Sequence, residues 1–419
     1  MNDSMNTSMH QDKMSHQNDS FSMIPRNFVP STSSTSSSMS QKTNDSGVSM
    51  SSGQMTFAQT QFMKTSSFPF IDDVNKYKRI AKIGHGTYGE VFKACNPTTN
   101  KIVALKRVLD DNKKFGFSMT TLREIRILQQ INHENVVNLI EVCRSTSSVG
   151  GYHSNFYLVF EFCEHDLAGL LSNTNVRFNL GEIKSILKQL LNGIYFVHSC
   201  KIFHRDLKPA NILVTKTGVV KLADFGLSRQ FNLSDKYRQA TPTNQVVTLW
   251  YRSPELLLGD INYGLAIDMW SVGLIMAEMW TRSPILQGKT EQEQIYLISQ
   301  FCGAITPEVW PTVTELPLYK TLHLSKDPTR KIKDRLRPYV KDFHARDLID
   351  SLLILDPTKR FDTNAALDHD FFFVDPLPAD LSKLFAKHHR SMFDLHTRQR
   401  PPNANPNRTQ DGGYMDHVY

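Results

Sequence analysis

The most informative stretch of this sequence is His204-Arg205-Asp206-Leu207-Lys208-Pro209-Ala210-Asn211. The triplet Asp224-Phe225-Gly226 follows it, with Asp224 eighteen residues after Asp206. Two carboxylates and one amide supply the hard oxygen ligands that Mg²⁺ prefers, and a carboxylate also accepts the proton of a hydroxyl group. Each motif alone can arise by chance. Together, in this order and at these spacings, they predict metal-assisted chemistry on a hydroxyl group.

A glycine-rich segment lies upstream, at Gly84-His85-Gly86-Thr87-Tyr88-Gly89-Glu90-Val91. Glycines at this spacing let backbone N–H groups approach phosphate oxygens, because no Cβ stands in the way. The same pattern marks dinucleotide-binding folds, but those require a helix after the third glycine. Here the strand-like run 90–94 follows instead. The segment therefore predicts a β-hairpin that covers a nucleotide.

Lys106 ends the strand-like run Val103-Ala104-Leu105-Lys106, seventeen residues after Gly89. A lone lysine on a strand is usually a solvated charge. Glu124 lies on the next predicted helix, within Thr121-Leu122-Arg123-Glu124-Ile125, and gives Lys106 a partner. Such a pair is suited to hold the α- and β-phosphates of ATP.

The chain between the two terminal segments has two parts with different sequence patterns. Residues 77–162 contain short β-type runs at 77–83, 90–95, 102–108 and 156–160, with one helical stretch at 120–130. Residues 163–373 are mostly helical in pattern, with apolar stripes at 183–194 and 267–280. We expect an α+β protein with a small β-rich lobe, a larger helical lobe and a ligand-binding cleft between them.

Residues 1–70 are dominated by Ser, Thr, Met, Asn and Gln, which favours a disordered arm, with or without a role as a phosphorylated segment. Residues 374–419 form a polar, partly ordered C-terminal tail in this interpretation. Five scattered cysteines without a C-x-x-C pair argue against a disulfide framework or a zinc site and favour a reducing compartment. No apolar run approaches membrane-spanning length, and the N-terminus lacks the apolar core of a secretion signal.

The formal net charge is +7 and the pI is about 9.0. This excess favours acidic or phosphorylated partners, or describes an ordinary solvated surface. It falls short of a basic stripe for nucleic acid, and no nucleic-acid-binding motif accompanies it.

These motifs together resemble the eukaryotic protein kinase family over residues 77–373, with lobes at 77–162 and 163–373. The resemblance implies that Asp206 is the catalytic base, that Lys208 steadies the transferred phosphoryl group, and that Asn211 and Asp224 hold Mg²⁺. It also implies that Phe160 closes the back of the adenine pocket and that the backbone of Glu161 and Cys163 binds adenine; for Phe160 and Cys163, core packing is the alternative. The full ATP-binding set implied is Ile83, Gly84, Gly86, Gly89, Val91, Ala104, Lys106, Phe160, Glu161, Cys163 and Asp166.

Two further segments are similar to cyclin-dependent kinases, at 118–124 and at Thr248-Leu249-Trp250-Tyr251-Arg252. By this resemblance, Thr243 is the activating phosphosite, and a cyclin binds the helix that contains Glu124. Asp268 would brace the catalytic loop, which is the segment 204–211. Glu255 would pair with Arg360. The arginines implied to grip the phosphate on Thr243 are Arg123, Arg205 and Arg229.

Stretches 134–141, 157–171, 280–285 and 302–311 are similar to the members of this family that act in transcription elongation. The resemblance implies a cyclin of the T type, a nuclear location, and the RNA polymerase II heptad tail and elongation factors as substrates. We expect low activity until the cyclin moves Glu124 towards Lys106.

Two other classes of kinase are the alternatives to this interpretation. A mitogen-activated-type kinase would need Thr-x-Tyr where this chain has Thr241-Pro242-Thr243. A catalytically dead kinase acting as a scaffold would usually lack the strand lysine, the base or a metal ligand, and this chain keeps all of them.

Overall fold

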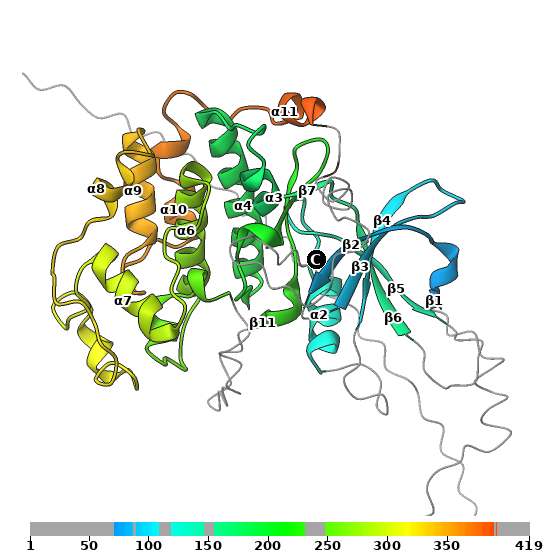
Figure 1. Cartoon of the computed structure of the whole chain (residues 1–419). Coiled ribbons are helices and arrows are strands. Elements are labelled where there is room, and N and C mark those ends of the chain that lie inside the picture. The colour runs from blue at the N-terminus through cyan, green and yellow to red at the C-terminus, as the bar shows by residue number, and fades with distance from the viewer. Residues whose placement is uncertain are drawn as a thin grey trace, which may run out of the picture. The chain divides into compact units, whose positions relative to one another are not determined.

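The computed structural model describes residues 71–86, 89–108, 119–145, 155–230, 248–388 and Ser391. Within these ranges the chain begins with a six-stranded sheet and continues into a mostly helical part (Figure 1). The expected arm 1–70, Thr243 and residues 392–419 lie outside the described residues. No helix in the described part is both long and apolar enough to cross a membrane.

The sheet has the strand order β1-β5-β6-β4-β3-β2 within the described residues. Neighbouring strands are antiparallel, except that β1 and β5 are parallel. One helix, α2 (Met119–Gln130), and one 3₁₀ turn, η1 (Val74–Lys76), accompany the described part of this lobe. The strands are β1 (Asp72–Asp73), β2 (Lys78–Gly86), β3 (Gly89–Cys95), β4 (Ile102–Arg107), β5 (Leu139–Ser145) and β6 (Asn155–Glu161).

The side chains of β4 alternate between two cores, as a strand requires. Val103 and Leu105 are buried in a small apolar cluster on one face, whereas Ala104 belongs to the large core of the molecule. Lys106 shares the face of Ala104 because it is two residues further along the strand. This register directs Lys106 to the side of the sheet that faces α2 and the helical lobe.

The helical lobe is built around two long helices, α4 (Leu180–Ser199) and α6 (Ala266–Thr281). A capping box of Asn179 and Glu182 starts α4. Every residue of α6 from Ile267 to Met279 is buried, so this helix is the centre of the lobe. The other α-helices are α3 (Leu167–Ser172), α5 (Pro254–Leu257), α7 (Glu291–Cys302), α8 (Ile332–Leu336), α9 (Phe343–Leu352), α10 (Thr363–Leu367) and α11 (Ser382–Lys387).

Two small sheets lie at the junction with the N-terminal lobe. They hold the segments that carry the predicted catalytic and metal-binding residues. One has the order β10-β9-β7 and the other pairs β11 with β8. The strands are β7 (His165–Asp166), β8 (Ile202–Phe203), β9 (Ile212–Val214), β10 (Val220–Leu222) and β11 (Arg229–Gln230), and the 3₁₀ turns are η2 (Pro209–Asn211), η3 (Phe225–Leu227), η4 (Leu249–Tyr251), η5 (Pro311–Glu315) and η6 (Asp370–Phe372).

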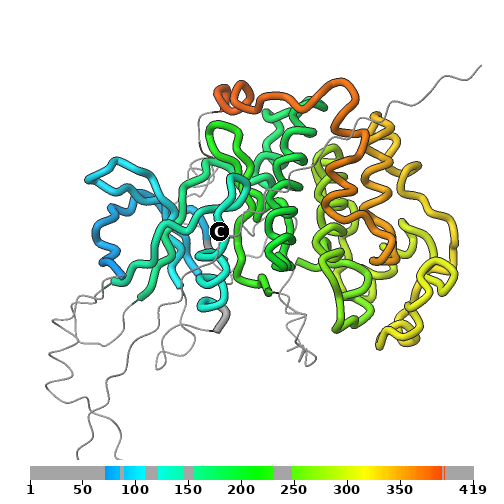
Figure 2. The backbone as a smooth tube through the Cα atoms, turned by 180° about the vertical axis from the view of Figure 1, so that it is seen from behind, coloured from blue at the N-terminus to red at the C-terminus, as the bar shows by residue number. Residues whose placement is uncertain are grey.

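The segment after η6 returns to the junction of the two lobes. Figure 2 shows it from behind as the orange tube that ends in α11. The Phe385 ring packs against the His165 ring, with 5.3 Å between the ring centroids. The Ser391 hydroxyl donates to the backbone carbonyl of Glu164 over 2.9 Å. The first part of the expected polar tail is therefore folded against the helical lobe.

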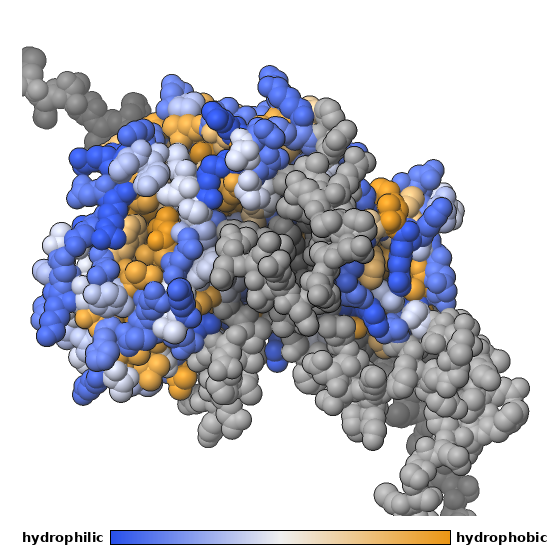
Figure 3. Space-filling model, viewed as in Figure 1, coloured by the Kyte–Doolittle hydropathy of each residue, from blue (hydrophilic) through white to orange (hydrophobic). Residues whose placement is uncertain are grey.

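The surface seen in Figure 3 is mostly hydrophilic, with separate apolar patches over the helical lobe. The basic stretch 330–337 is part of this folded surface. Ile332 and Leu336 of α8 are buried, and Arg330, Lys331 and Lys333 pair with acidic side chains. Most positive charges of the stretch are thus compensated within the fold, so it is part of the ordinary surface of the helical lobe.

Candidate active site

Three charged side chains from three distant elements meet between the lobes. Lys106 Nζ on β4 is 2.8 Å from Glu124 Oε1 on α2 and 3.0 Å from Asp224 Oδ1. All three side chains are at most 6% exposed. Asp224 adopts a left-handed backbone with φ of 63°, directly before η3, and α2 packs against that turn. The structure therefore brings together the lysine, the glutamate and one of the predicted metal ligands.

The pKa values of these three side chains depend on their burial and on the charges of their neighbours in the cluster. Burial alone would lower the pKa of Lys106, but the carboxylates of Asp224 and Glu124 outweigh it and raise that pKa, so Lys106 is charged. Burial raises the pKa of Glu124 despite the opposing charge of Lys106. For Asp224, the effect of Lys106 exceeds that of burial and its pKa is lowered. One cation compensates two buried carboxylates incompletely: it lowers the pKa of Asp224, whereas the pKa of Glu124 stays raised.

The catalytic loop supplies the second part of the cluster. Asn211 Nδ2 donates to the backbone carbonyl of Asp206 over 2.8 Å and lies 3.2 Å from its Oδ2. Lys208 Nζ is 3.1 Å from the same carboxylate oxygen and donates to the hydroxyl of Thr248. Burial raises the pKa of Asp206; Lys208 opposes this rise and Asp224 adds to it.

Three oxygen atoms of this cluster fit a divalent cation. In the described part of the chain, Asp206 Oδ1, Asn211 Oδ1 and Asp224 Oδ2 are buried and have no hydrogen-bond partner. Buried polar atoms are otherwise almost always paired, so three unpaired oxygens on predicted site residues need an explanation. Carboxylate and amide oxygens are the ligands Mg²⁺ takes in phosphoryl-transfer sites. The donor set suits that ion.

Asp268, at the start of α6, holds the catalytic loop from behind. Its Oδ1 accepts from the backbone N–H of Arg205, and its Oδ2 accepts from that of His204, each over 2.9 Å. His198 Nε2 lies 2.9 Å from Oδ2. Burial would raise the pKa of Asp268, but these hydrogen bonds and nearby histidines lower it. The predicted brace is confirmed, and His198 is an additional member that the sequence did not single out.

The kinase resemblance implies that residues 224–255 form the activation segment, and Glu255 at its end forms a buried ion pair with the helical lobe. Arg360 binds Glu255 with both branches of its guanidinium group, over 2.8 and 3.0 Å. The two side chains are at most 1% exposed, and the guanidinium lies over the Trp270 ring. The predicted pairing of Glu255 with Arg360 is confirmed.

The predicted ATP-binding residues lie on the β2–β3 hairpin and the sheet beneath it. Gly84 pairs with Val91, and Gly86 with Gly89, as expected for a hairpin flap. Gly89 has φ of 137°, which only glycine adopts readily. Within the same apolar core lie Ile83, Val91, Ala104, Phe160 and Cys163.

Two of the predicted ATP-site side chains already hold structural contacts. The Glu161 carboxylate accepts from the backbone N–H of Asn138 and pairs with Lys221, both over 2.8 Å. Asp166 is the N-cap of α3, since its Oδ1 accepts from the backbone N–H of Gly169 over 2.7 Å. Because the Glu161 carboxylate is engaged in these contacts, its backbone is the part that can bind adenine, as the sequence resemblance implies.

The three arginines implied to bind a phosphate come from three elements. Arg123 is on α2, Arg205 is in the catalytic loop, and Arg229 is on β11. Burial lowers the pKa of Arg123, and the nearby positive charges of Arg229 and Arg205 lower it further. No carboxylate of the described residues forms an ion pair with any of them. The structure thus gathers three guanidinium groups that lack a compensating anion among the described residues.

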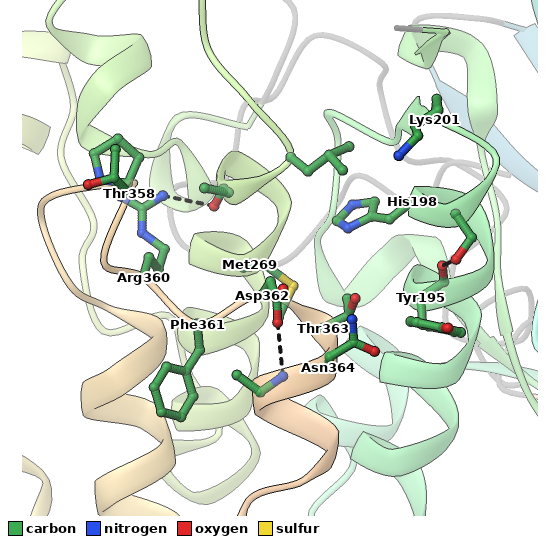
Figure 4. Close-up of a pocket in the computed structure, with 15 residues that line it drawn as sticks. Tyr195, His198, Lys201, Met269, Thr358, Arg360, Phe361, Asp362, Thr363 and Asn364 are labelled. Atoms are coloured by element: carbon green, nitrogen blue, oxygen red, sulfur yellow. Dashed lines mark hydrogen bonds between the residues drawn. The ribbon is translucent and has the colours of Figure 1, made fainter.

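A cavity of about 570 Å³ opens on the helical lobe, away from the Lys106 cluster (Figure 4). The ends of α4 and α6 and the segment before α10 line it. His198 and Arg360, labelled in the figure, face this space, and they are the partners of Asp268 and Glu255. The cavity therefore adjoins the supports of the catalytic loop and of the activation segment, whereas the predicted nucleotide site is elsewhere.

Known proteins match this chain over the same region. The family described as "Protein kinase domain" matches residues 77–372. Cyclin-dependent kinase 9-A of Xenopus laevis is 57% identical over 350 residues, which cover 80% of this chain and 93% of that protein. Cyclin-dependent kinase 9 of Homo sapiens is 59% identical over 327 residues, 78% of this chain and 88% of that protein.

A solved structure matches as well. It is a chain from the crystal structure of the yeast RNA Pol II CTD kinase CTDK-1 complex, 35% identical with a TM-score of 0.66. The match covers 76% of this chain and 99% of that chain.

Proposed function

This chain belongs to the protein kinase family and, within it, to the cyclin-dependent kinase 9 group; from that membership we infer that it phosphorylates Ser-Pro and Thr-Pro sites in the RNA polymerase II C-terminal repeats. It is a serine/threonine protein kinase, and kinases of this family use ATP and Mg²⁺. A cyclin of the T type activates it, elongation factors are further substrates, and it acts in the nucleus. The observation that carries the proposal is the convergence of the Lys106 cluster and the catalytic loop around three unpaired oxygens.

The residues of the cluster divide the work of phosphoryl transfer. Lys106, held by Glu124, binds the α- and β-phosphates. Mg²⁺, when bound, neutralises charge on the phosphates, and Asn211 and Asp224 would hold it. Lys208 steadies the transferred group.

Asp206 orients the substrate hydroxyl and accepts its proton. Burial raises the pKa of this carboxyl, which makes the carboxylate a stronger proton acceptor than an exposed one. Asn211 contributes by holding Asp206 through its amide N–H, which leaves the amide oxygen for the metal.

The cyclin contact is the exposed side of α2. Leu122 is 37% exposed there and offers an apolar side chain to a partner. The sequence resemblance implies that a cyclin moves Glu124 towards Lys106, but the structure has this pair closed at 2.8 Å. A buried ammonium needs carboxylate partners, and two are within reach, so the closed pair is a stable arrangement of the chain itself. The cyclin then stabilises α2 in this position rather than moving it there.

The test uses the full chain with a T-type cyclin, ATP and Mg²⁺, and measures phosphate transfer to a heptad-repeat peptide. We expect labelling of that peptide and little labelling of a matched peptide in which alanine replaces each proline after the acceptor serine. Asp206→Asn is the inactive control. Equal labelling of both peptides would contradict the substrate assignment, and labelling by Asp206→Asn would contradict the assignment of the base.

A further inference from the structure

Arg205 is held in an unusual conformation. Its backbone is left-handed, with φ of 69°, a region that residues other than glycine rarely adopt. The backbone N–H is fixed by Asp268, as described above. Its guanidinium group is fixed by two neutral acceptors: Nε donates to the carbonyl of Leu227 over 2.6 Å, and Nη1 donates to the hydroxyl of Tyr263 over 2.9 Å.

Tyr263 lies just before α6 and touches more than Arg205. Its ring meets the Phe203 ring edge-on, at 6.0 Å between centroids and 71° between planes. Phe203 is the residue of β8 that pairs with Arg229 of β11. Tyr263 therefore contacts one arginine of the cluster through its hydroxyl and supports, through its ring, the strand that is paired with another.

The hydrogen bond from Arg205 to Tyr263 opposes the electrostatic repulsion among the three arginines. The positive charges of Arg229 and Arg205 act on Arg123, and no carboxylate of the described residues neutralises any of the three guanidinium groups. Long cationic side chains in such a cluster gain by turning apart into solvent. The Tyr263 hydroxyl holds Arg205 in place against this tendency without neutralising its charge, whereas a carboxylate at the same position would neutralise it.

We propose that Tyr263 is a positioning residue that holds Arg205 ready for a phosphate monoester on the activation segment. The proposal rests on the proposed function, in which that phosphate is on Thr243. The tyrosine orients the arginine before the phosphate arrives, so less side-chain freedom is lost when the charge-assisted bonds form.

The test compares wild type with Tyr263→Phe, which removes the hydroxyl and keeps the ring on Phe203. Both are prepared as cyclin complexes with Thr243 either phosphorylated or not. We expect the activation produced by phosphorylation to fall about tenfold or more in Tyr263→Phe, the size of one lost hydrogen bond to a charged group. The phosphate on Thr243 should also be removed faster by a phosphatase, by a similar factor, since Arg205 shields it less well.

Tyr296→Phe is the matched control, because Tyr296 is 40% exposed on α7 and its hydroxyl accepts only from Gln300 among the described residues. It should leave both readouts at the wild-type level. A lower melting temperature for Tyr263→Phe, with equal losses in the two phosphorylation states and unchanged phosphatase sensitivity, would show a merely structural role and overturn the proposal. If Thr243→Ala is as active as the phosphorylated wild type, the proposed activation by Thr243 fails, and this inference fails with it.

Discussion

At the scale of single residues, the active site keeps several charges out of water. Lys106 and its two carboxylate partners are at most 6% exposed, and a buried charge destabilises a protein unless it is paired. The arrangement leaves one oxygen of Asp224 and one of Asp206 unpaired. Binding of a cation and a nucleotide would satisfy these atoms, so the protein holds its reactive groups in place at the expense of stability.

The variant Asp224→Asn tests whether this carboxylate is needed for phosphoryl transfer and not for the stability of the fold. The amide keeps the size of the side chain and removes one of two carboxylates around Lys106, so the fold should be retained. Phosphoryl transfer should fall by about 100-fold or more, because a charged metal ligand is lost. Peptide labelling and thermal unfolding measure the two effects.

The matched control for this variant is Asp334→Asn, since the Asp334 side chain is 77% exposed and lies outside the cluster. It should change neither activity nor melting temperature. A large drop in melting temperature for Asp224→Asn, or retained activity, would contradict the assignment.

The acidic side of the pH–rate profile should report Asp206. A protonated carboxyl group accepts no proton, so kcat/KM falls as pH drops through the pKa of Asp206, which is raised above its ordinary value near 4. Lys208 lowers that pKa, so Lys208→Ala should move the acidic side of the profile to higher pH, besides lowering the maximum. Kinetics across the pH range measure this. A shift to lower pH, or no shift, would assign the titration to another group.

At the scale of elements, two helices carry the supports of the site. The first turn of α6 presents Asp268 to the catalytic loop, and the end of α4 presents His198 to Asp268. Arg360 connects Glu255 to the start of α6, since it also donates to the carbonyl of Ala266 over 2.8 Å. The catalytic loop and the activation-segment anchor are thus fixed to the same helix end.

Breaking this anchor should cost far more stability than breaking a similar pair at the surface. Glu255→Gln leaves the Arg360 guanidinium buried without its counter-charge, and we expect a loss of about 3–5 kcal/mol. Glu291→Gln is the matched control, because Glu291 pairs with Arg252 but is 48% exposed, and it should lose no more than about 1 kcal/mol. Denaturant unfolding of the two variants gives both values. Similar losses would show that burial does not decide the strength of the pair.

The elements that periodicity predicted are those with a strong apolar pattern. The helical stretches at 120–130, 183–194 and 267–280 lie within α2, α4 and α6. In contrast, β5 was missed, because Cys143 is its only fully buried side chain and its alternation is weak. The short strands β7 to β11 were missed as well, since two or three residues carry no period.

The predicted catalytic and metal-binding residues were easier to find than the residues that support them. Spacing marked Asp206, Asn211 and Asp224, and resemblance supplied Asp268 and Glu255. His198 and Tyr263 were not found from the sequence, because each acts through a side chain distant in the sequence, across 70 and 58 residues. A single sequence contains no local pattern for such contacts.

At the scale of the whole molecule, the two lobes share one core. The large apolar cluster joins Ile83 and Val91 of the N-terminal sheet to Phe225 and to the helices around α6. The contact of Lys106 with Glu124 and Asp224 crosses the same junction. A partner that fixes α2 therefore acts on Lys106 and on the Asp224 segment at once, because α2 packs against η3.

Leu122→Asp should uncouple the chain from its cyclin while leaving the chain folded. Leu122 is 37% exposed on α2, so a charge there is tolerated in the free chain, whereas an interface that buries this side chain would have to bury the charge. We expect cyclin affinity to fall by about tenfold or more, the contribution of one buried leucine, and cyclin-stimulated activity to fall with it. Leu377→Asp is the matched control, because Leu377 is an exposed leucine (56%) that lies outside α2, and this variant should bind normally. If Leu122→Asp binds the cyclin with wild-type affinity, the partner does not contact this side of α2, and the coupling of α2 to the Lys106 cluster has to be driven from another surface.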